Sequence, residues 1–323
     1  MRTRICDLFS IQYPIISGGM MWLTTPEFAA AVSNAGGLGI ITAARNTSKA
    51  DLVDEIRRMR DLTNKPFGVN VSMLPEVQPM EMTKQFFEAI AEEHVPVIET
   101  AGRDPGDLFN IVKDAGTKII HKVPTVRHAV HAQKGGADAV TIVGMECGGH
   151  PGMENVGSIV LVPRAAESVS IPVIAGGGFS DARGLVAALA LGAEGVCMGT
   201  RFMATEECAI HANYKDWMVN ASERDTMLIQ RSIKNQARVR VNRDAEKVLE
   251  LEEQGATLAD LMPYISGSHG RDGAFTGDLD MGTLCMGQGV GLVKDIKPVA
   301  QVISEIMTEA EDVMSRLKGI FGR

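Results

Sequence analysis

Residues 172–200 decide the fold, and their sequence is PVIAGGGFSDARGLVAALALGAEGVCMGT. Residues 172–175 are a short apolar run beside a glycine cluster, which is typical of a buried strand. The three glycines at 176–178 let the chain turn sharply before a helix, whose cap is Ser180 or Asp181. A second short apolar run follows that helix. The stretch therefore predicts a strand, a glycine turn, a helix and another strand.

Both predicted strands end in a glycine turn, and uncovered backbone N–H groups at such turns attract anions, most often phosphate. In a (β/α)8 barrel, a phosphate site of this kind follows the last two strands. We therefore expect the two turns to hold the phosphate of a cofactor. The residues assigned to this end of the site are Ala175, Gly176, Gly177, Gly178, Met198, Gly199 and Thr200.

Six further apolar runs precede this stretch, and most are followed by a helical pattern. They lie at residues 13–17, 38–42, 67–72, 95–100, 118–123 and 139–143. Repeated strand-then-helix units with continuously apolar strands indicate a parallel sheet. Eight such strands predict an α/β fold closed into a (β/α)8 TIM barrel. An open doubly wound sheet is the alternative, but such sheets usually have fewer strands.

The alternation stops after the eighth strand. Residues 204–280 are more polar, and we interpret them as a small, mainly helical cap inserted into a barrel made of residues 1–203 and 281–323. The expected cap helices lie near residues 211–224, 243–254 and 257–265. A basic stretch at 231–240 is interpreted as a solvated face. The glycine-rich segment 282–292 is expected to pack back onto the barrel.

Composition excludes several function classes. The net charge of the 323 residues is −8 with both signs interspersed, which argues against binding to nucleic acid or to an anionic membrane. The five cysteines are scattered without a CxxC pair, so neither a disulfide framework nor a structural zinc site is indicated. No run reaches the roughly 20 apolar residues of a membrane span, and the N-terminus lacks a signal core. A cytoplasmic location is therefore expected.

In a (β/α)8 barrel the functional groups lie at the C-terminal ends of the strands. The candidates at this rim are Gly18, Gly19, Met20, Asn70, Ser72, Lys122, Gly149 and His150. No carboxylates and histidines among the rim residues have metal-site spacing, so no metal is expected. A glycine-lined floor with one amide, one lysine and one histidine suits a flat phosphorylated cofactor.

Five polar side chains near this rim receive separate interpretations. Lys122 follows a buried strand, and a cation there stabilises the negative charge of a reduced flavin near its pyrimidine ring. His121 should point the opposite way, toward the helices, as a structural residue. His150 lies in a shaped GGHPG turn and is the predicted catalytic acid or base. Cys147 is expected to be a small buried thiol, with a nucleophile as the alternative. Whether His269 of the cap reaches the mouth is left open.

Several motifs together resemble the nitronate monooxygenase (2-nitropropane dioxygenase) family of FMN-dependent barrels. They are PIISGGM, KPFGVN, HKV, GMECGGHPG, the stretch quoted above with the RF that follows it, and GDLDMGTLCMGQGVGL, and they extend over nearly the whole chain. The glycine turns alone also look like those of inosine-monophosphate dehydrogenases. The resemblance implies FMN across the barrel mouth, with its phosphate at the two glycine turns. It also implies that the flavin ring lies over residues 18–20 near Asn70 and Lys122, with His150 at the flavin face.

The resemblance implies more than one activity. Some members oxidise alkyl nitronates with O2, close relatives are NAD(P)H:quinone reductases, and a similar branch reduces enoyl thioesters of acyl carrier protein. The last branch has glutamate-alanine where this chain has Glu146 and Cys147, which favours the first two. Nitronate oxidation is our first hypothesis, and quinone reduction with NADH or NADPH as co-substrate is the second. A flavin-free nucleotide-binding barrel is a further alternative, and the oligomeric state is open, with a homodimer among the options.

Overall fold

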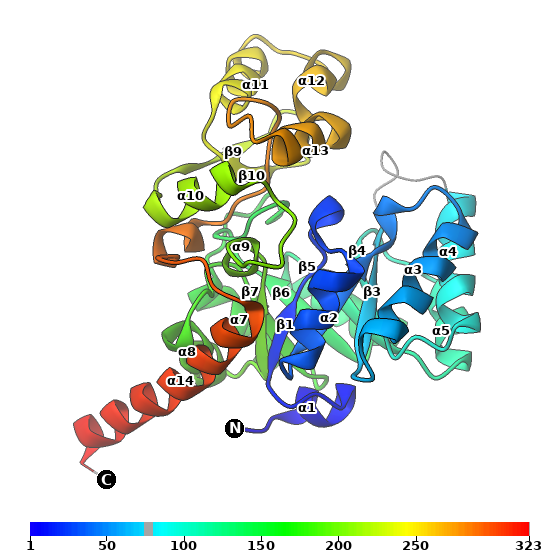
Figure 1. Ribbon diagram of the computed structural model, residues 1–323, viewed down its shortest axis with the longest axis vertical. Helices are drawn as coiled ribbons and strands as arrows, with labels where there is room; N and C mark the ends of the chain where they lie inside the picture. The colour runs from blue at the N-terminus through cyan, green and yellow to red at the C-terminus, as the bar shows by residue number, and fades with distance from the viewer. Residues whose placement is uncertain (74–79, 323) are drawn as a thin grey trace.

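The computed structural model describes residues 1–73 and 80–322, and its centre is a closed barrel (Figure 1). Eight parallel strands of the described chain close it in sequence order, with β1 paired to both β2 and β8. The strands are β1 (Ile15–Ser17), β2 (Leu38–Thr42), β3 (Phe67–Met73), β4 (Val97–Gly102), β5 (Lys118–Val123), β6 (Ala139–Val143), β7 (Val173–Gly176) and β8 (Gly195–Met198). The predicted (β/α)8 barrel is therefore confirmed.

The interior of the barrel is apolar at its lower end, where the N-terminal ends of the strands and the short helix α1 (Arg4–Phe9) lie. Alternate residues of each strand point inward, and Ile16, Ile40, Val97, Ile120 and Ile174 form one buried cluster there. Helix α1 adds its apolar side chains to the same cluster. Because the lower end is closed in this way, the chemistry must lie at the opposite end.

Helices cover the outside of the barrel. They are α2 (Pro26–Asn34), α3 (Lys49–Leu62), α4 (Met80–Glu92), α5 (Leu108–Asp114), α6 (Val126–Gly135), α7 (Ser158–Ser168), α8 (Ala182–Ala190) and α14 (Val299–Phe321), with the one-turn α9 (Thr200–Met203) after β8. Side-chain caps begin several of them, as the sequence suggests. Asp181, not Ser180, caps α8 by accepting a 2.9 Å hydrogen bond from the amide of Gly184.

The segment after β8 stands at the end of the barrel where the loops after β1 and β6 lie (Figure 1). Its helices are α10 (Ala212–Asn220), α11 (Arg243–Glu253), α12 (Leu258–Ile265) and α13 (Gly267–Thr276). It also contains an antiparallel hairpin of β9 (Thr226–Ile229) and β10 (Ala237–Arg240), which the sequence reasoning missed.

The hairpin corrects the interpretation of the basic stretch as a solvated face. Arg238 and Arg240 are buried in β10. The guanidinium of Arg238 donates a 2.9 Å hydrogen bond to the carbonyl of Met145. The guanidinium of Arg240 lies 4.6 Å from the centre of the Trp217 ring. Two arginines of the stretch therefore hold the cap together and join it to the barrel, because carbonyls and an aromatic face replace their water.

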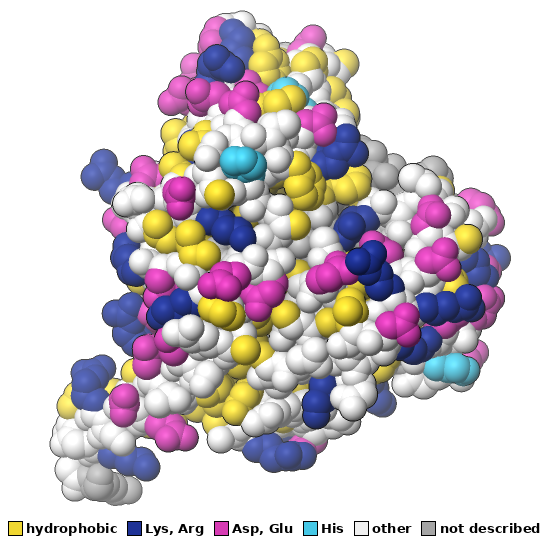
Figure 2. Space-filling model, viewed as in Figure 1, with side chains coloured by type: hydrophobic (Ala, Val, Ile, Leu, Met, Phe, Trp, Pro, Cys, Tyr) yellow, Lys and Arg dark blue, Asp and Glu magenta, His cyan; other side chains and the backbone are white. Residues whose placement is uncertain are grey.

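Acidic and basic side chains are interspersed over the face of the molecule that Figure 2 shows. Among the described residues, no helix combines the length and the apolar character needed to cross a bilayer.

Candidate active site

The floor of the barrel mouth is built around Glu99, a fully buried carboxylate on β4. Its Oε1 lies 3.0 Å from the Nζ of Lys122 on β5. Its Oε2 accepts hydrogen bonds from the Nδ2 of Asn70 at 2.8 Å and from the amide of Gly19 at 3.2 Å. One carboxylate therefore joins three of the predicted rim residues. Sequence reasoning missed Glu99, although a carboxylate inside the apolar strand VIETAG was a visible signal.

The glycines after β1 are explained by this cluster. A Cβ on Gly18 would lie 2.8 Å from the Sγ of Cys197 and 3.1 Å from the Nζ of Lys122. A Cβ on Gly19 would lie 2.6 Å from the side-chain amide carbon of Asn70. Both positions exclude a side chain because the floor side chains already fill the space.

The floor carries the cation of Lys122 paired with the anion of Glu99, and its thiols are protonated. Burial disfavours the charge on Lys122 and is the largest single effect on its pKa. The attraction and hydrogen bond of Glu99, together with the influence of Cys197 and Cys147, outweigh it and raise the pKa of the lysine above its usual value. Burial raises the pKa of Cys147 to about 12 and that of Cys197 to about 11, in spite of the nearby lysine. A neutral thiol is a poor nucleophile, so these values favour the small-thiol interpretation of Cys147.

The glycine corner after β7 and β8 has the features of an anion site. Gly177 and Gly178 have φ angles of +94° and +81°, which only glycine adopts easily. No acceptor among residues 1–73 and 80–322 takes the N–H of Gly178 or Gly199. A Cβ on Gly199 would meet nothing closer than the Sδ of Met20 at 3.6 Å, so the space beside this residue is open.

The segment 284–292 closes this corner from above, as expected for its packing on the barrel. The amide of Gly287 donates a 3.0 Å hydrogen bond to the Oγ1 of Thr200. Gly289 lies against Ser180, where a Cβ would come within 2.4 Å of the serine Oγ. Ala175 and Met198 are buried and pack among the side chains of the outer core, so only their backbone faces the corner.

His150 is held at the rim by the cap. The neighbouring Gly149 exchanges two backbone hydrogen bonds with Arg238 of β10, at 3.0 and 2.7 Å. His150 itself is exposed and forms no hydrogen bond or ion pair with another described residue. The surrounding protein nevertheless lowers its pKa by partial desolvation. At neutral pH the imidazole is therefore uncharged, and both of its ring nitrogens are available to a bound molecule.

The other side chains near the rim have structural partners. His121 is buried, lies 2.7 Å from the Oγ1 of Thr100 and faces the ring of Phe109, which matches the predicted orientation toward the helices. Glu146 accepts hydrogen bonds from the amide and hydroxyl of Ser158 at the start of α7. Ser72 is half-buried on β3 and is separated from Lys122 by β4, whose Ala101 pairs with Ser72 on one side and with Lys122 on the other.

His269 does not serve the floor in this structure. Its Nε2 lies 2.8 Å from a carboxylate oxygen of Asp244, and the same oxygen accepts a 2.7 Å hydrogen bond from the amide of Gly282. These contacts join α13 to the start of α11 within the cap. The question that the sequence left open therefore has a structural answer for His269.

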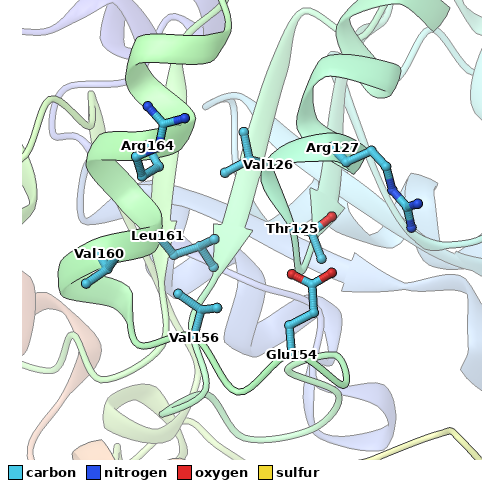
Figure 3. Close-up of a pocket in the computed structure, with 8 residues that line it drawn as sticks. All are labelled: Thr125, Val126, Arg127, Glu154, Val156, Val160, Leu161 and Arg164. Atoms are coloured by element: carbon cyan, nitrogen blue, oxygen red, sulfur yellow. The ribbon is translucent and has the colours of Figure 1, made fainter.

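A cavity of about 380 Å³ lies between the starts of α6 and α7 (Figure 3). It is lined by Thr125, Val126, Arg127, Glu154, Val156, Val160, Leu161 and Arg164. None of these belongs to the predicted site. Its two arginines diverge in Figure 3 rather than converging on one point. The chemistry of the donor groups therefore favours the barrel mouth over this cavity.

Comparison with known proteins identifies the family. The family model for nitronate monooxygenase matches residues 2–309. A probable nitronate monooxygenase of Staphylococcus aureus is 31% identical, over 97% of this chain and 98% of that protein. A Rhodococcus jostii protein named (3aS,4S,5R,7aS)-5-hydroxy-7a-methyl-1-oxo-octahydro-1H-indene-4-carboxyl-CoA dehydrogenase is 38% identical, in a match that covers 70% of this chain and 62% of that protein.

Solved structures agree with this assignment. FabK from Thermotoga maritima superposes with a TM-score of 0.92 and 41% identity, over 99% of both chains. A nitroalkane oxidase from Streptomyces ansochromogenes superposes with a TM-score of 0.83 and 27% identity, over 98% of this chain and all of that one. The chain is thus an oxidoreductase that belongs to the nitronate monooxygenase family.

Proposed function

We propose that the protein is an FMN-dependent oxidoreductase whose flavin binds across the barrel mouth. One observation carries the proposal: the amides of Gly178 and Gly199, which no described residue accepts, lie at the same end of the barrel as the ammonium of Lys122. The amides suit a phosphate, and the floor suits the electron-rich end of a flavin ring. FMN carries both groups, and family resemblance supports it as the cofactor.

The residues present divide between the two ends of FMN. Gly176, Gly177, Gly178, Gly199 and Thr200 would hold the phosphate through backbone and hydroxyl groups. The residues that would border the ring are Gly18, Gly19, Met20, Asn70, Ser72, Lys122 and Gly149. In this proposal residues 1–203 and 281–323 bind the cofactor, and the cap of residues 204–280 covers the substrate. When bound, FMN would be the group that accepts electrons from the substrate.

Oxidation of an alkyl nitronate with O2 is the reaction we propose first. The neutral imidazole of His150 would donate its N–H to an oxygen of a bound nitronate. With a neutral nitroalkane, its other ring nitrogen would accept the α-proton. Lys122 would offset negative charge below the ring. The match to a probable nitronate monooxygenase over nearly the full chain supports this choice. O2 as oxidant and a homodimeric assembly stay predictions.

A second candidate is redox chemistry on an acyl thioester. The Rhodococcus relative is named as a carboxyl-CoA dehydrogenase, and it is 38% identical over 70% of this chain, against 31% over 97% for the Staphylococcus relative. In this case His150 would act on the carbon next to the thioester carbonyl, which is another weakly acidic C–H position. Reduction of a quinone with NADH or NADPH remains the further alternative on the same floor.

One parallel experiment separates these activities. FMN-loaded protein is mixed anaerobically with ethylnitronate, propionate-3-nitronate, NADH, NADPH or a saturated acyl-CoA, and the flavin absorbance near 450 nm is followed. Bleaching by a nitronate, with recovery on adding O2, supports the first proposal. Bleaching by NADH or NADPH alone, with recovery by a quinone or an enoyl-CoA, would replace it with the corresponding reductase.

A further inference from the structure

Glu99 is a fully buried carboxylate at the floor of the barrel mouth. We infer that Glu99 is a positioning residue that fixes Lys122 and, by balancing its charge, sets how strongly the site prefers reduced over oxidised flavin. The inference rests on the proposed FMN site and deepens it.

The contacts of Glu99 link three separate segments of the barrel. Its two oxygens reach the ammonium of Lys122 on β5, the amide of Asn70 on β3 and the backbone N–H of Gly19 after β1. The carboxylate is fully buried, whereas 21% of the Lys122 side chain is exposed. Lys122 is therefore the accessible end of the pair, and Glu99 is the hidden anchor that sets its position.

The glycine geometry supports a fixed position for the ammonium. The Nζ of Lys122 lies so close to Gly18 that a Cβ there would be only 3.1 Å away. The Sγ of Cys197 bounds the same space from the β8 side. A lysine confined between a carboxylate below, a thiol beside it and a bare glycine has few alternative rotamers. Its charge is therefore directed to one place at the mouth.

The charges of the pair predict the direction in which each substitution shifts the flavin's preference for its reduced form. The Glu99–Lys122 pair is neutral overall, so the cation attracts a reduced flavin while the buried anion next to it weakens that attraction. Removing the anion leaves the ammonium of Lys122, whose side chain is 21% exposed and so keeps contact with water, without a counter-charge. The floor then becomes more positive and favours the reduced flavin. Removing the cation should do the opposite. An unpaired buried carboxylate binds a proton, so the effect of Glu99 should largely vanish when Lys122 is absent.

The test is a double-mutant cycle on the reduction potential of bound FMN, with the variants Glu99→Gln, Lys122→Met and the two combined. We expect Glu99→Gln to raise the preference for reduced over oxidised FMN at least tenfold, which is about 30 mV for a two-electron couple. We expect Lys122→Met to lower it at least tenfold, and the double variant to stay within about twofold of Lys122→Met. A matched control is Asp138→Asn. Asp138 accepts a 2.8 Å hydrogen bond from the amide of Ile119, at the end of β5 opposite to Lys122.

The outcomes are distinct. A change below about twofold for Glu99→Gln, or the same change with and without Lys122, would overturn the inference. An equal change in Asp138→Asn would overturn it as well, since that charge lies at the far end of the barrel. If Glu99→Gln does not purify, Glu99→Asp decides: a preserved preference supports charge balance, and a tenfold change contradicts it. Wild-type protein that binds no FMN would instead refute the proposed function.

Discussion

At the scale of single residues, the proposed site combines a free imidazole with an anchored cation. His150 has no bonded partner among the described residues, whereas Lys122 is held by Glu99 at 3.0 Å. The difference is consistent with their proposed roles, because a residue that exchanges protons must reach substrate and a residue that supplies a fixed charge must not move.

Replacing His150 by alanine tests the first role. We expect His150→Ala to lower kcat with a neutral nitroalkane about a hundredfold or more, because a positioned acid or base typically contributes that much. FMN occupancy should not change, since the imidazole is not part of the phosphate corner. Because the pKa of His150 is lowered, wild-type activity should stay flat through neutral pH and fall only on the acid side. Steady-state kinetics with absorbance of the bound flavin check both points.

His121 gives a prediction about stability that is independent of the site. Burial lowers its pKa to about 4, so the unfolded chain, with a pKa near 6.5, binds more protons between these values. The neutral, buried His121 therefore contributes to the free energy of unfolding above about pH 6.5. This contribution is lost as pH falls toward 4, and the loss is roughly 2–3 kcal/mol at most. His121→Gln should be less stable at pH 7 but should lose less stability on acidification. Urea unfolding at pH 7 and near pH 4 measures the difference. The control is His94→Asn, because His94 is exposed.

At the scale of elements, the glycine turn after β7 supports the loop after β6. A Cβ on Gly177 would lie 3.0 Å from the carbonyl oxygen of Gly144 and 3.2 Å from the amide of Cys147. A Cβ at this position therefore meets the protein's own backbone and not open space. The contact is with the backbone of the loop of residues 144–157, which contains His150.

We therefore expect Gly177→Ala to weaken FMN binding at least tenfold and to lower turnover as well, because the loop after β6 must shift. The matched control is Gly192→Ala. Gly192 has a similar φ of +92° and a similar close neighbour, the Cβ of Ala166 at 3.1 Å, but it ends α8 on the outside of the barrel. Both variants should lose about 1–2 kcal/mol of stability from left-handed backbone strain. Only Gly177→Ala should lose flavin. Equal FMN affinity for the two variants would contradict this account.

At the scale of the whole molecule, the cap and the barrel meet on two sides of the mouth. On one side β10 pairs with Gly149 next to His150. On the other, the indole N–H of Trp22 donates a 3.1 Å hydrogen bond to the carbonyl of Gly267, and the guanidinium of Arg271 lies 5.4 Å from the Trp22 ring centre. The cap is thereby fastened across the opening between the loops after β1 and β6.

The Trp22 contact should affect substrate more than cofactor. Trp22→Phe keeps an aromatic ring but removes the hydrogen bond to α13, which is worth about 1 kcal/mol. We expect KM to rise about fivefold, with kcat and the FMN potential within about twofold of wild type. A loss of bound FMN in this variant would show that the cap belongs to the cofactor site instead.

The sequence predicted the barrel well because its strands are short apolar runs that end at glycine, and because strand ends share one rim. Glu99 was visible as a carboxylate within an apolar strand, but its role follows only from its contact with Lys122, which lies on the next strand. The hairpin of β9 and β10 was missed for a similar reason. The alternation ARVR is that of a solvated strand until the carbonyl of Met145 and the ring of Trp217 are known to receive its arginines.

The most direct test of the central claim compares the binding of FMN and riboflavin, which differ only by the phosphate. Two charge-assisted hydrogen bonds from Gly178 and Gly199 should favour FMN at least a hundredfold, or about 3 kcal/mol. We therefore predict that fluorescence titration will give one FMN per chain, bound at least a hundredfold more tightly than riboflavin. Equal affinities, or no binding of either flavin, would contradict the account.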